Sequence, residues 1–296
     1  MTEQDPYADD DFEPVAPPKG AGKKADRRAV MPGEPDEGDD LDCVLAFKPL
    51  NDFGNATRLI QRFGEDLMHV ENIGWFAWDG ARWDRERGQA EAVKRCHQVA
   101  QAIVREARAL EESRGKDYAE RVNKLFGWAV QSGNTAKAHG MLAAAQPYLA
   151  QPVDSLDSDP FLLAAPNGTI ELDLHCALRE SSREDRITRV LGVKYNTRAE
   201  CPRWLQFLEQ IMPDREMRDF LQRICGYSLT GSAREQAFFI FYGTGNNGKS
   251  TLMSMLRRVM DSYAMNSPVS TFLAKRDGAG GAEASPDLAR LPGARL

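Results

Sequence analysis

The residues with the clearest chemistry are Gly243-Thr244-Gly245-Asn246-Asn247-Gly248-Lys249-Ser250, which match the phosphate-binding pattern G-x-x-x-x-G-K-[ST]. The glycines let the backbone curl tightly enough for successive N–H groups to face one anion. We expect Lys249, the predicted catalytic residue, to reach the β- and γ-phosphates of a nucleoside triphosphate. Ser250 then offers a hydroxyl ligand to Mg²⁺, and Thr251 meets the α-phosphate. Residues 243–251 are therefore predicted to bind ATP and Mg²⁺.

The segments on both sides of this loop are of the kind that position it. Residues 237–242 form a short, continuously apolar and aromatic run, which predicts a strand buried on both faces of a parallel sheet. After the loop, apolar side chains recur at helical spacing at Leu252, Met255, Leu256, Val259, Met260 and Tyr263. The pattern predicts an α/β nucleotide-binding sheet, with a helix whose N-terminus points at the phosphates.

The first 42 residues differ in composition from the rest of the chain. They contain thirteen Asp and Glu but only five Lys and Arg, with many Pro and Gly and few large apolar residues. Such a segment buries too little surface to fold, so we predict a disordered acidic tail over residues 1–42. Because the whole chain carries a net charge of −6, the remainder is slightly basic, and the overall acidity does not argue against a nucleic-acid partner.

Residues 43–200 are predicted to form a mixed α and β domain. Asp79-Gly80 and Asn167-Gly168 each lie between strand-like segments, which indicates two β-hairpins. Between them we expect three helices: one carrying Val93 to Leu110 and ending near Gly115, one over residues 118–130, and one that Thr135 caps and that ends near Pro147.

Residues 201–296 are predicted to begin the ATPase domain. Pro202 starts a helix with an apolar stripe of Trp204, Phe207, Leu208 and Ile211, and Pro213 starts a second helix that Gly226 ends. We expect both stripes to be core.

Three tryptophans near the first hairpin, Trp75, Trp78 and Trp83, have two interpretations. Their rings have the chemistry to stack on the bases of single-stranded DNA, and Arg82, Arg85 and Arg87 lie beside them. Aromatic residues in a hairpin more often pack in a core or across the strands, and we favour that interpretation.

Several motifs, taken in order, resemble the phage and plasmid primase/helicase family. The central motifs are residues 220–231, Glu235-Gln236 and the glycine-rich loop with its two asparagines. Upstream of these lie Asn51-Asp52, residues 75–80 with Trp83, and residues 166–172. Downstream lie residues 286–291 and 293–296. In that family a poxvirus-type primase/helicase N-terminal domain precedes a superfamily 3 helicase domain. The resemblance covers about residues 43–296.

The resemblance implies an AAA+-like P-loop sheet, here incomplete, and an ATP-dependent DNA helicase. Such a protein couples ATP hydrolysis to DNA unwinding, typically as a homo-hexamer on single-stranded or forked DNA, with a separate primase as a further candidate partner. Two departures matter: the chain has only a short tail where the family commonly has a primase domain, and the acidic second ATPase motif and arginine finger are expected beyond Leu296. We therefore expect a truncated chain that binds ATP weakly and hydrolyses little of it.

Two other functions stay open from the residues alone. One is a P-loop kinase or small-molecule ATPase, and the other is a non-catalytic remnant that binds nucleotide. No apolar run approaches the ~20 residues needed to cross a bilayer, and the acidic N-terminus lacks the features of a signal peptide. We expect a cytoplasmic protein without a membrane partner.

Overall fold

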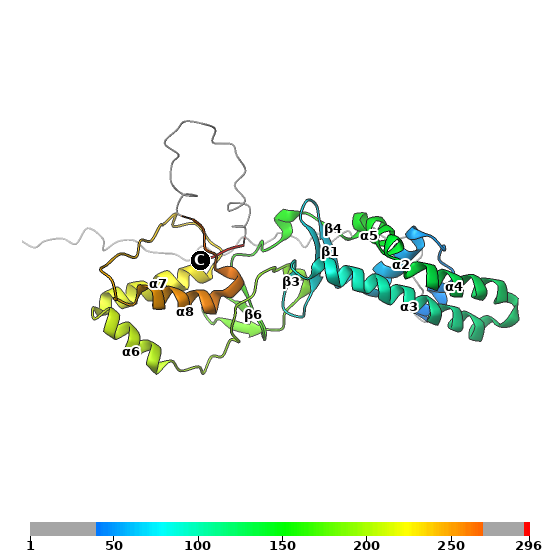
Figure 1. Cartoon of the computed structure of the whole chain (residues 1–296). Coiled ribbons are helices and arrows are strands. Elements are labelled where there is room, and N and C mark those ends of the chain that lie inside the picture. Colours follow the sequence, from blue (N-terminus) through cyan, green and yellow to red (C-terminus); the bar gives the residue numbers. More distant parts are fainter. Residues whose placement is uncertain (1–39, 269–292) are drawn as a thin grey trace, which may run out of the picture. The chain divides into compact units, whose positions relative to one another are not determined.

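A computed structural model describes residues 40–268 and 293–296, which form a mixed α/β structure with two small sheets (Figure 1). Residues 1–39 of the predicted tail lie outside the described residues, and so does the predicted motif at residues 286–291. Leu41 and Asp42, which the prediction assigned to the tail, belong to the first helix, α1 (Leu41–Ala46).

Five helices surround the larger apolar core: α1, α2 (Asp52–Phe63), α3 (Gly88–Arg114), α4 (Ala119–Ser132) and α5 (Thr135–Leu149). Asn51 begins α2, because its side-chain oxygen accepts a hydrogen bond from the Gly54 backbone N–H at 2.8 Å. Gly115 ends α3 with a φ of +66°, a conformation that glycine adopts without strain. Figure 1 shows α3 running alongside α4, and the 3₁₀ turn Gly115–Tyr118 joins the two helices.

The three helices expected in this region are confirmed. The last of them differs from the prediction at its end, because α5 continues through Pro147 to Leu149. A proline removes one backbone N–H donor, but in the last turn of a helix only that one hydrogen bond is lost. Thr135 is the first helical residue, and Asn134 takes the cap position.

The first sheet has the strand order β3-β2-β1-β4 and is antiparallel except between β1 and β4. Its strands are β1 (Leu67–Val70), β2 (Gly74–Trp78), β3 (Trp83–Asp84) and β4 (Ala150–Gln151). The predicted hairpin is confirmed, but residues 79–82 connect the strands rather than two residues alone. The carboxylate of Asp79 closes this longer loop by accepting hydrogen bonds from the backbone N–H groups of Ala81 and Arg82, both at 2.8 Å.

The second sheet is antiparallel and contains β5 (Leu162–Ala165), β6 (Gly168–Glu171) and β7 (Ala177–Arg179). The second predicted hairpin is confirmed, with its turn at Pro166-Asn167 because Ala165 pairs with Gly168. Gly168 has a φ of +149°, and an added Cβ there would lie 2.3 Å from the Arg179 carbonyl oxygen. The smaller second core packs on this sheet.

The α-helices among the remaining described residues are α6 (Pro202–Ile211), α7 (Arg215–Leu229) and α8 (Lys249–Met260). Pro202 opens α6 as predicted. The predicted limits of α7 are wrong: Asp214 caps its start, and the helix passes Gly226, since one glycine costs only about 1 kcal/mol in a helix. Short 3₁₀ turns occur at Gly115–Tyr118 (η1), Val153–Ser155 (η2), Arg183–Asp185 (η3) and Asp261–Tyr263 (η4).

The predicted strand at residues 237–242 is not formed. These residues have no regular secondary structure, and Phe238, Ile240 and Tyr242 expose 80%, 72% and 89% of their surface. A strand in a parallel sheet depends on neighbouring strands for its backbone hydrogen bonds. No strand among residues 40–268 and 293–296 pairs with it, so the P-loop NTPase sheet expected from the sequence is not present in the described part of the chain.

Candidate nucleotide-binding site

The glycine-rich loop connects residues 237–242 to α8 and contains several backbone positions with positive φ. Gly243 has a φ of +150°, Asn246 of +59° and Gly248 of +81°. Gly243 and Gly248 therefore have conformations that favour glycine, whereas Gly245 is not in the left-handed region. The sequence predicts that Gly243, Gly245 and Gly248 all allow the loop to curl. The backbone has a conformation that favours glycine at two of them, Gly243 and Gly248.

Helix α6 lies directly against this loop. A Cβ added to Gly248 would lie 2.5 Å from the Cγ2 atom of Ile211 and 3.3 Å from the Cζ atom of Phe207. Both side chains belong to the apolar stripe predicted on α6. That stripe is half-buried rather than fully buried, and its Ile211 and Phe207 side chains lie against Gly248.

Lys249, the first residue of α8, directs its ammonium group back into the loop. Its Nζ atom donates to the carbonyl oxygen of Gly243 at 2.9 Å, to that of Thr244 at 3.3 Å and to the Oδ1 atom of Asn247 at 2.8 Å. The hydrogen bond from the Leu252 N–H to the Gly248 carbonyl, at 2.9 Å, starts the helix. Earlier N–H groups in this first turn have no partner within the helix and are free to bind an anion.

The donor set of residues 243–251 fits a triphosphate with its metal ion. It combines a lysine ammonium, the exposed hydroxyl-bearing residues Ser250 and Thr251, and the N-terminus of α8, and it contains no carboxylate that would repel phosphate. An added Cβ at Gly243 would lie 2.2 Å from the Nδ2 atom of Asn247, so a side chain at position 243 would displace the Asn247 amide.

The opposite end of α8 is attached to the second sheet. The hydroxyl of Tyr263 accepts a hydrogen bond from the buried Ala164 N–H on β5 at 3.0 Å. Ser262 accepts from the Val190 N–H at 2.7 Å and donates to the Val190 carbonyl at 2.9 Å. The periodicity predicted Tyr263 only as an apolar helix position. Its phenol group instead anchors the helix that carries Lys249 and Ser250.

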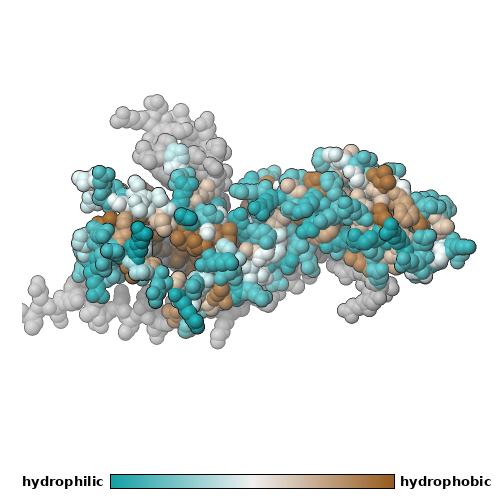
Figure 2. Space-filling model, turned by 60° about the horizontal axis from the view of Figure 1, so that its bottom comes forward, coloured by the Kyte–Doolittle hydropathy of each residue, from teal (hydrophilic) through white to brown (hydrophobic). Residues whose placement is uncertain are grey.

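The apolar face of α8 is only partly covered. Leu252 and Met260 are buried, but Met255 exposes 42% of its surface and Val259 is also exposed. The prediction that this whole face packs on a sheet is wrong for the described residues, because the strand at 237–242 that would begin that sheet is not formed. Figure 2 shows hydrophobic side chains at the surface on its left-hand side, where α6, α7 and α8 lie.

The tryptophans of the first hairpin have the core role favoured from the sequence. Trp75 and Trp83 expose only 4% and 3% of their surface, and the Nε1 atom of Trp83 donates to the Arg183 carbonyl at 2.9 Å. Trp78 packs on Trp83 with ring centroids 5.7 Å apart. Two of these three rings are therefore inaccessible to a nucleic-acid base.

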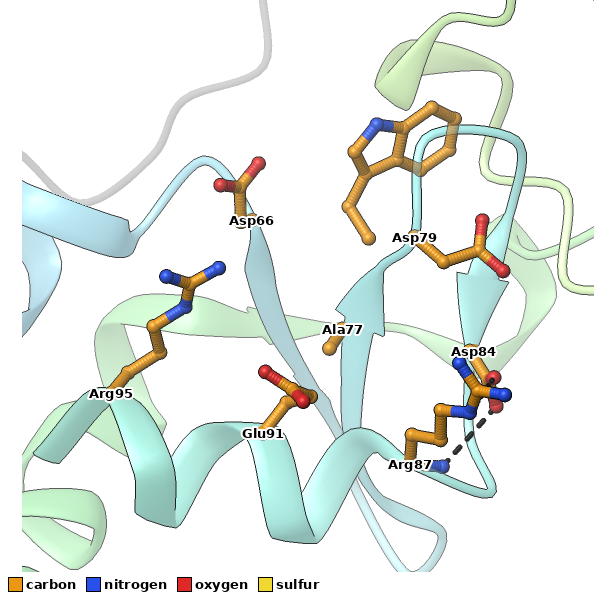
Figure 3. A pocket seen from close by; sticks show the side chains of 8 residues that line it. Asp66, Ala77, Asp79, Asp84, Arg87, Glu91 and Arg95 are labelled. Atoms are coloured by element: carbon orange, nitrogen blue, oxygen red, sulfur yellow. Dashed lines mark hydrogen bonds and ion pairs between the residues drawn. The ribbon is translucent and has the colours of Figure 1, made fainter.

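A second candidate site is a pocket of about 200 Å³ beside this hairpin (Figure 3). Figure 3 shows Glu91 and Arg95 rising from α3, with Asp79 and Asp84 on the hairpin side. Its lining contains more carboxylates than basic groups: Asp66, Asp79, Asp84 and Glu91 against Arg87 and Arg95. This charge balance does not suit a phosphate group.

The carboxylates of this pocket already have basic partners. Asp66 pairs with Arg183 at 2.6 Å, Glu91 with Lys94 at 3.2 Å, and Asp84 with Arg82 and Arg87 at 3.7 and 3.8 Å. In the residues that the structure describes, no group of three or more His, Cys, Asp or Glu side chains is placed to hold a metal ion. The glycine-rich loop is therefore the better candidate for a functional site.

Comparison with known proteins gives the family. The family model described as "D5 N terminal like" matches residues 56–213, which is more than half of the chain. Among viral relatives, "Putative helicase L207/L206" of Acanthamoeba polyphaga mimivirus is 28% identical over 145 residues, which are 48% of this chain and 15% of that protein.

Two further relatives carry similar names. "Putative helicase 121R" of Invertebrate iridescent virus 3 is 26% identical over 192 residues, 63% of this chain and 19% of that protein. "Putative helicase 022R" of Frog virus 3 is 28% identical over 89 residues, 30% of this chain and 9% of that protein. The matched segments therefore span less than a fifth of each viral relative. Among the described helices, none is long and apolar enough to span a membrane. With the family match over residues 56–213, the chain belongs to the D5-type primase-helicase family.

Proposed function

We propose that residues 243–251 bind ATP with Mg²⁺, and that this chain is the ATP-binding portion of a superfamily 3 DNA helicase. The observation that carries the proposal is the arrangement at the start of α8. A lysine ammonium, two hydroxyl-bearing residues and a helix N-terminus meet on one loop, whose Gly243 and Gly248 have positive φ values that favour glycine.

Each residue of the loop has a defined role in this proposal. Lys249 exchanges its carbonyl contacts for the β- and γ-phosphates, and Thr251 contacts the α-phosphate. Ser250 is the protein ligand to Mg²⁺, which, when bound, neutralises charge on the phosphates. The backbone N–H groups of residues 243–248 and of the first turn of α8 hold the phosphate oxygens.

The family and the names of the viral relatives support DNA as the partner. In the whole protein we propose a homo-hexamer on single-stranded or forked DNA, in the cytoplasm, with a separate primase as a further candidate partner. We also propose that hydrolysis uses acidic residues outside residues 243–251, together with an arginine from a neighbouring subunit.

A binding titration tests the proposed site. Lys249→Ala removes a charge-assisted contact of roughly 1.5 to 3 kcal/mol, so the affinity for Mg-ATP is expected to fall about ten- to a hundredfold. The matched control is Lys194→Ala, because Lys194 is exposed in a loop and distant in sequence from the site. Calorimetry measures both variants beside the wild type, and circular dichroism checks that each is folded. Equal affinity in the wild type and Lys249→Ala would refute the assignment.

Turnover tests the helicase part of the proposal separately. In the whole protein we expect ATP hydrolysis that single-stranded DNA stimulates. ATP hydrolysis that single-stranded DNA leaves unchanged would contradict the helicase assignment. Phosphoryl transfer to a small acceptor would favour a kinase instead.

A further inference from the structure

The contacts of Lys249 give the adjacent Asn247 a specific part in the loop. An ammonium group has three N–H donors and no acceptor. Three acceptors of the loop lie within hydrogen-bonding distance of Nζ: two backbone carbonyl oxygens and the side-chain oxygen of Asn247. The Asn247 contact, at 2.8 Å, is the shortest of the three. It is also the one among them that a substitution can remove.

We propose that Asn247 is a positioning residue that competes with the phosphates of a bound nucleotide for the ammonium of Lys249. For Lys249 to reach a phosphate, hydrogen bonds to the loop must be exchanged for hydrogen bonds to phosphate oxygens. The strength of the Asn247 contact therefore sets part of the free energy of nucleotide binding. This inference rests on the proposed function, and it adds a residue whose side chain controls the availability of the lysine.

The backbone around Asn247 holds its amide in place for this role. Asn247 is half-buried, and its Nδ2 atom would lie 2.2 Å from a Cβ at Gly243. The amide therefore crosses the loop, with its nitrogen against Gly243 and its oxygen toward Lys249. The absence of a side chain at Gly243 provides the space that this orientation requires.

Asn246 provides a matched control because it is the same residue type one position earlier. It is exposed, and its φ of +59° is a conformation that Asn and Asp both tolerate. In the part of the chain that the structure describes, the hydrogen bonds of Lys249 include the side chain of Asn247 but not that of Asn246. Replacing either asparagine with Asp adds one negative charge to the loop. Only at Asn247 does the new carboxylate contact the ammonium of Lys249.

The first test uses no nucleotide and therefore does not depend on the proposed function. The rate at which an amine-specific reagent modifies Lys249 is measured by mass spectrometry in the full chain. Asn247→Ala releases the ammonium and is expected to raise this rate roughly three- to tenfold, whereas Asn246→Gly, which adopts the left-handed conformation of Asn246 without strain, leaves it unchanged. Equal labelling in the two variants would overturn the inference, even if ATP binds through the loop.

The second test uses nucleotides. Asn247→Asp turns a neutral contact to Lys249 into an ion pair and adds a negative charge that repels phosphate, so it is expected to lower Mg-ATP affinity about tenfold more than Asn246→Asp does. AMP lacks the phosphates that Lys249 contacts, so its affinity is expected to change equally in both variants. Equal losses of ATP affinity in the two variants would overturn the competition. Failure of the wild type to bind ATP would instead overturn the proposed function, and the competition with it.

Discussion

Arg58 and Glu106 form a fully buried ion pair between α2 and α3, with the Nε and Oε2 atoms 2.7 Å apart. Arg58 also donates to the carbonyl oxygens of Leu45 at 2.8 Å and Pro49 at 3.0 Å, so its charge has several acceptors. Without Arg58, Glu106 would keep one basic partner, Arg62 at 3.0 Å, but the carbonyl oxygens of Leu45 and Pro49 would lose their buried donor. These two residues therefore hold α1, α2 and α3 together.

Replacing Arg58 with Ala is expected to lower the free energy of unfolding by about 3 to 5 kcal/mol, because Glu106 loses one of its two basic partners and two buried carbonyl oxygens lose their donor. Arg105→Ala is the control, since Arg105 is exposed and pairs with Asp42 at 3.4 Å, a contact worth at most about 1 kcal/mol. Urea denaturation of both variants measures the difference. A loss of less than 1 kcal/mol in Arg58→Ala would contradict the account of this core.

Tyr263 links α8 to the second sheet, and its removal tests that link. Tyr263→Phe leaves the buried Ala164 N–H without an acceptor, which is expected to cost about 1 to 3 kcal/mol of unfolding free energy. Tyr195→Phe is the control, because the contacts of Tyr195 with Asn167 use its backbone atoms. Denaturation that is indistinguishable in the two variants would show that the phenol group does not anchor α8.

The same residue predicts a pH dependence. Burial raises the pKa of Tyr263 to about 12, whereas a tyrosine in an unfolded chain has a pKa of about 10. The folded protein therefore holds this proton more tightly, and the resulting stability is present below about pH 10 and is lost as the pH rises through about 12. In Tyr263→Phe the alkaline loss of stability is expected to be shallower. Parallel curves for the variant and the wild type would contradict this.

At the scale of elements, the contact between α6 and the loop explains why Gly248 is required. Gly248→Ala places a Cβ against Ile211 in a left-handed position, so the loop is expected to shift and Mg-ATP affinity to fall more than about tenfold. Gly245→Ala is the control, because a Cβ there meets no atom within 4 Å. Its affinity is expected to stay near the wild-type value. Equal losses in the two variants would show that the contact with α6 is unimportant.

Three of the predicted elements have clear local signals, whereas α2, which Asn51 caps, was not predicted. Helix α3 has an apolar stripe from Val93 to Leu110 with a terminal glycine, and both hairpins have turn residues between apolar strands. The predicted ends of other helices were less accurate, because α5 continues past Pro147 and α7 continues past Gly226. Single residues that disfavour a helix cost about 1 to 3 kcal/mol, and neighbouring contacts decide whether the helix continues.

The segment 237–242 shows where local signals fail. Its composition favours a strand, but a strand exists only with a partner, and none of the described strands pairs with it.

In the candidate site, too, local sequence signals predict some features and not others. The motif identified Lys249 and the glycines, whereas the contact of Ile211 with Gly248, the anchor at Tyr263 and the contact with Asn247 depend on residues brought together by folding or on side-chain direction.

For the whole molecule, the central claim is that the loop binds the phosphates of ATP through its backbone N–H groups and Lys249. Hydrogen exchange measured with and without Mg-ATP tests this claim most directly, because those amides gain acceptors on binding. We predict slower exchange in peptides that cover residues 243–251, a smaller change with AMP, which has only the α-phosphate, and a weaker effect in Lys249→Ala. Unchanged exchange in these peptides at saturating Mg-ATP, or slowing confined to another part of the chain, would contradict the account.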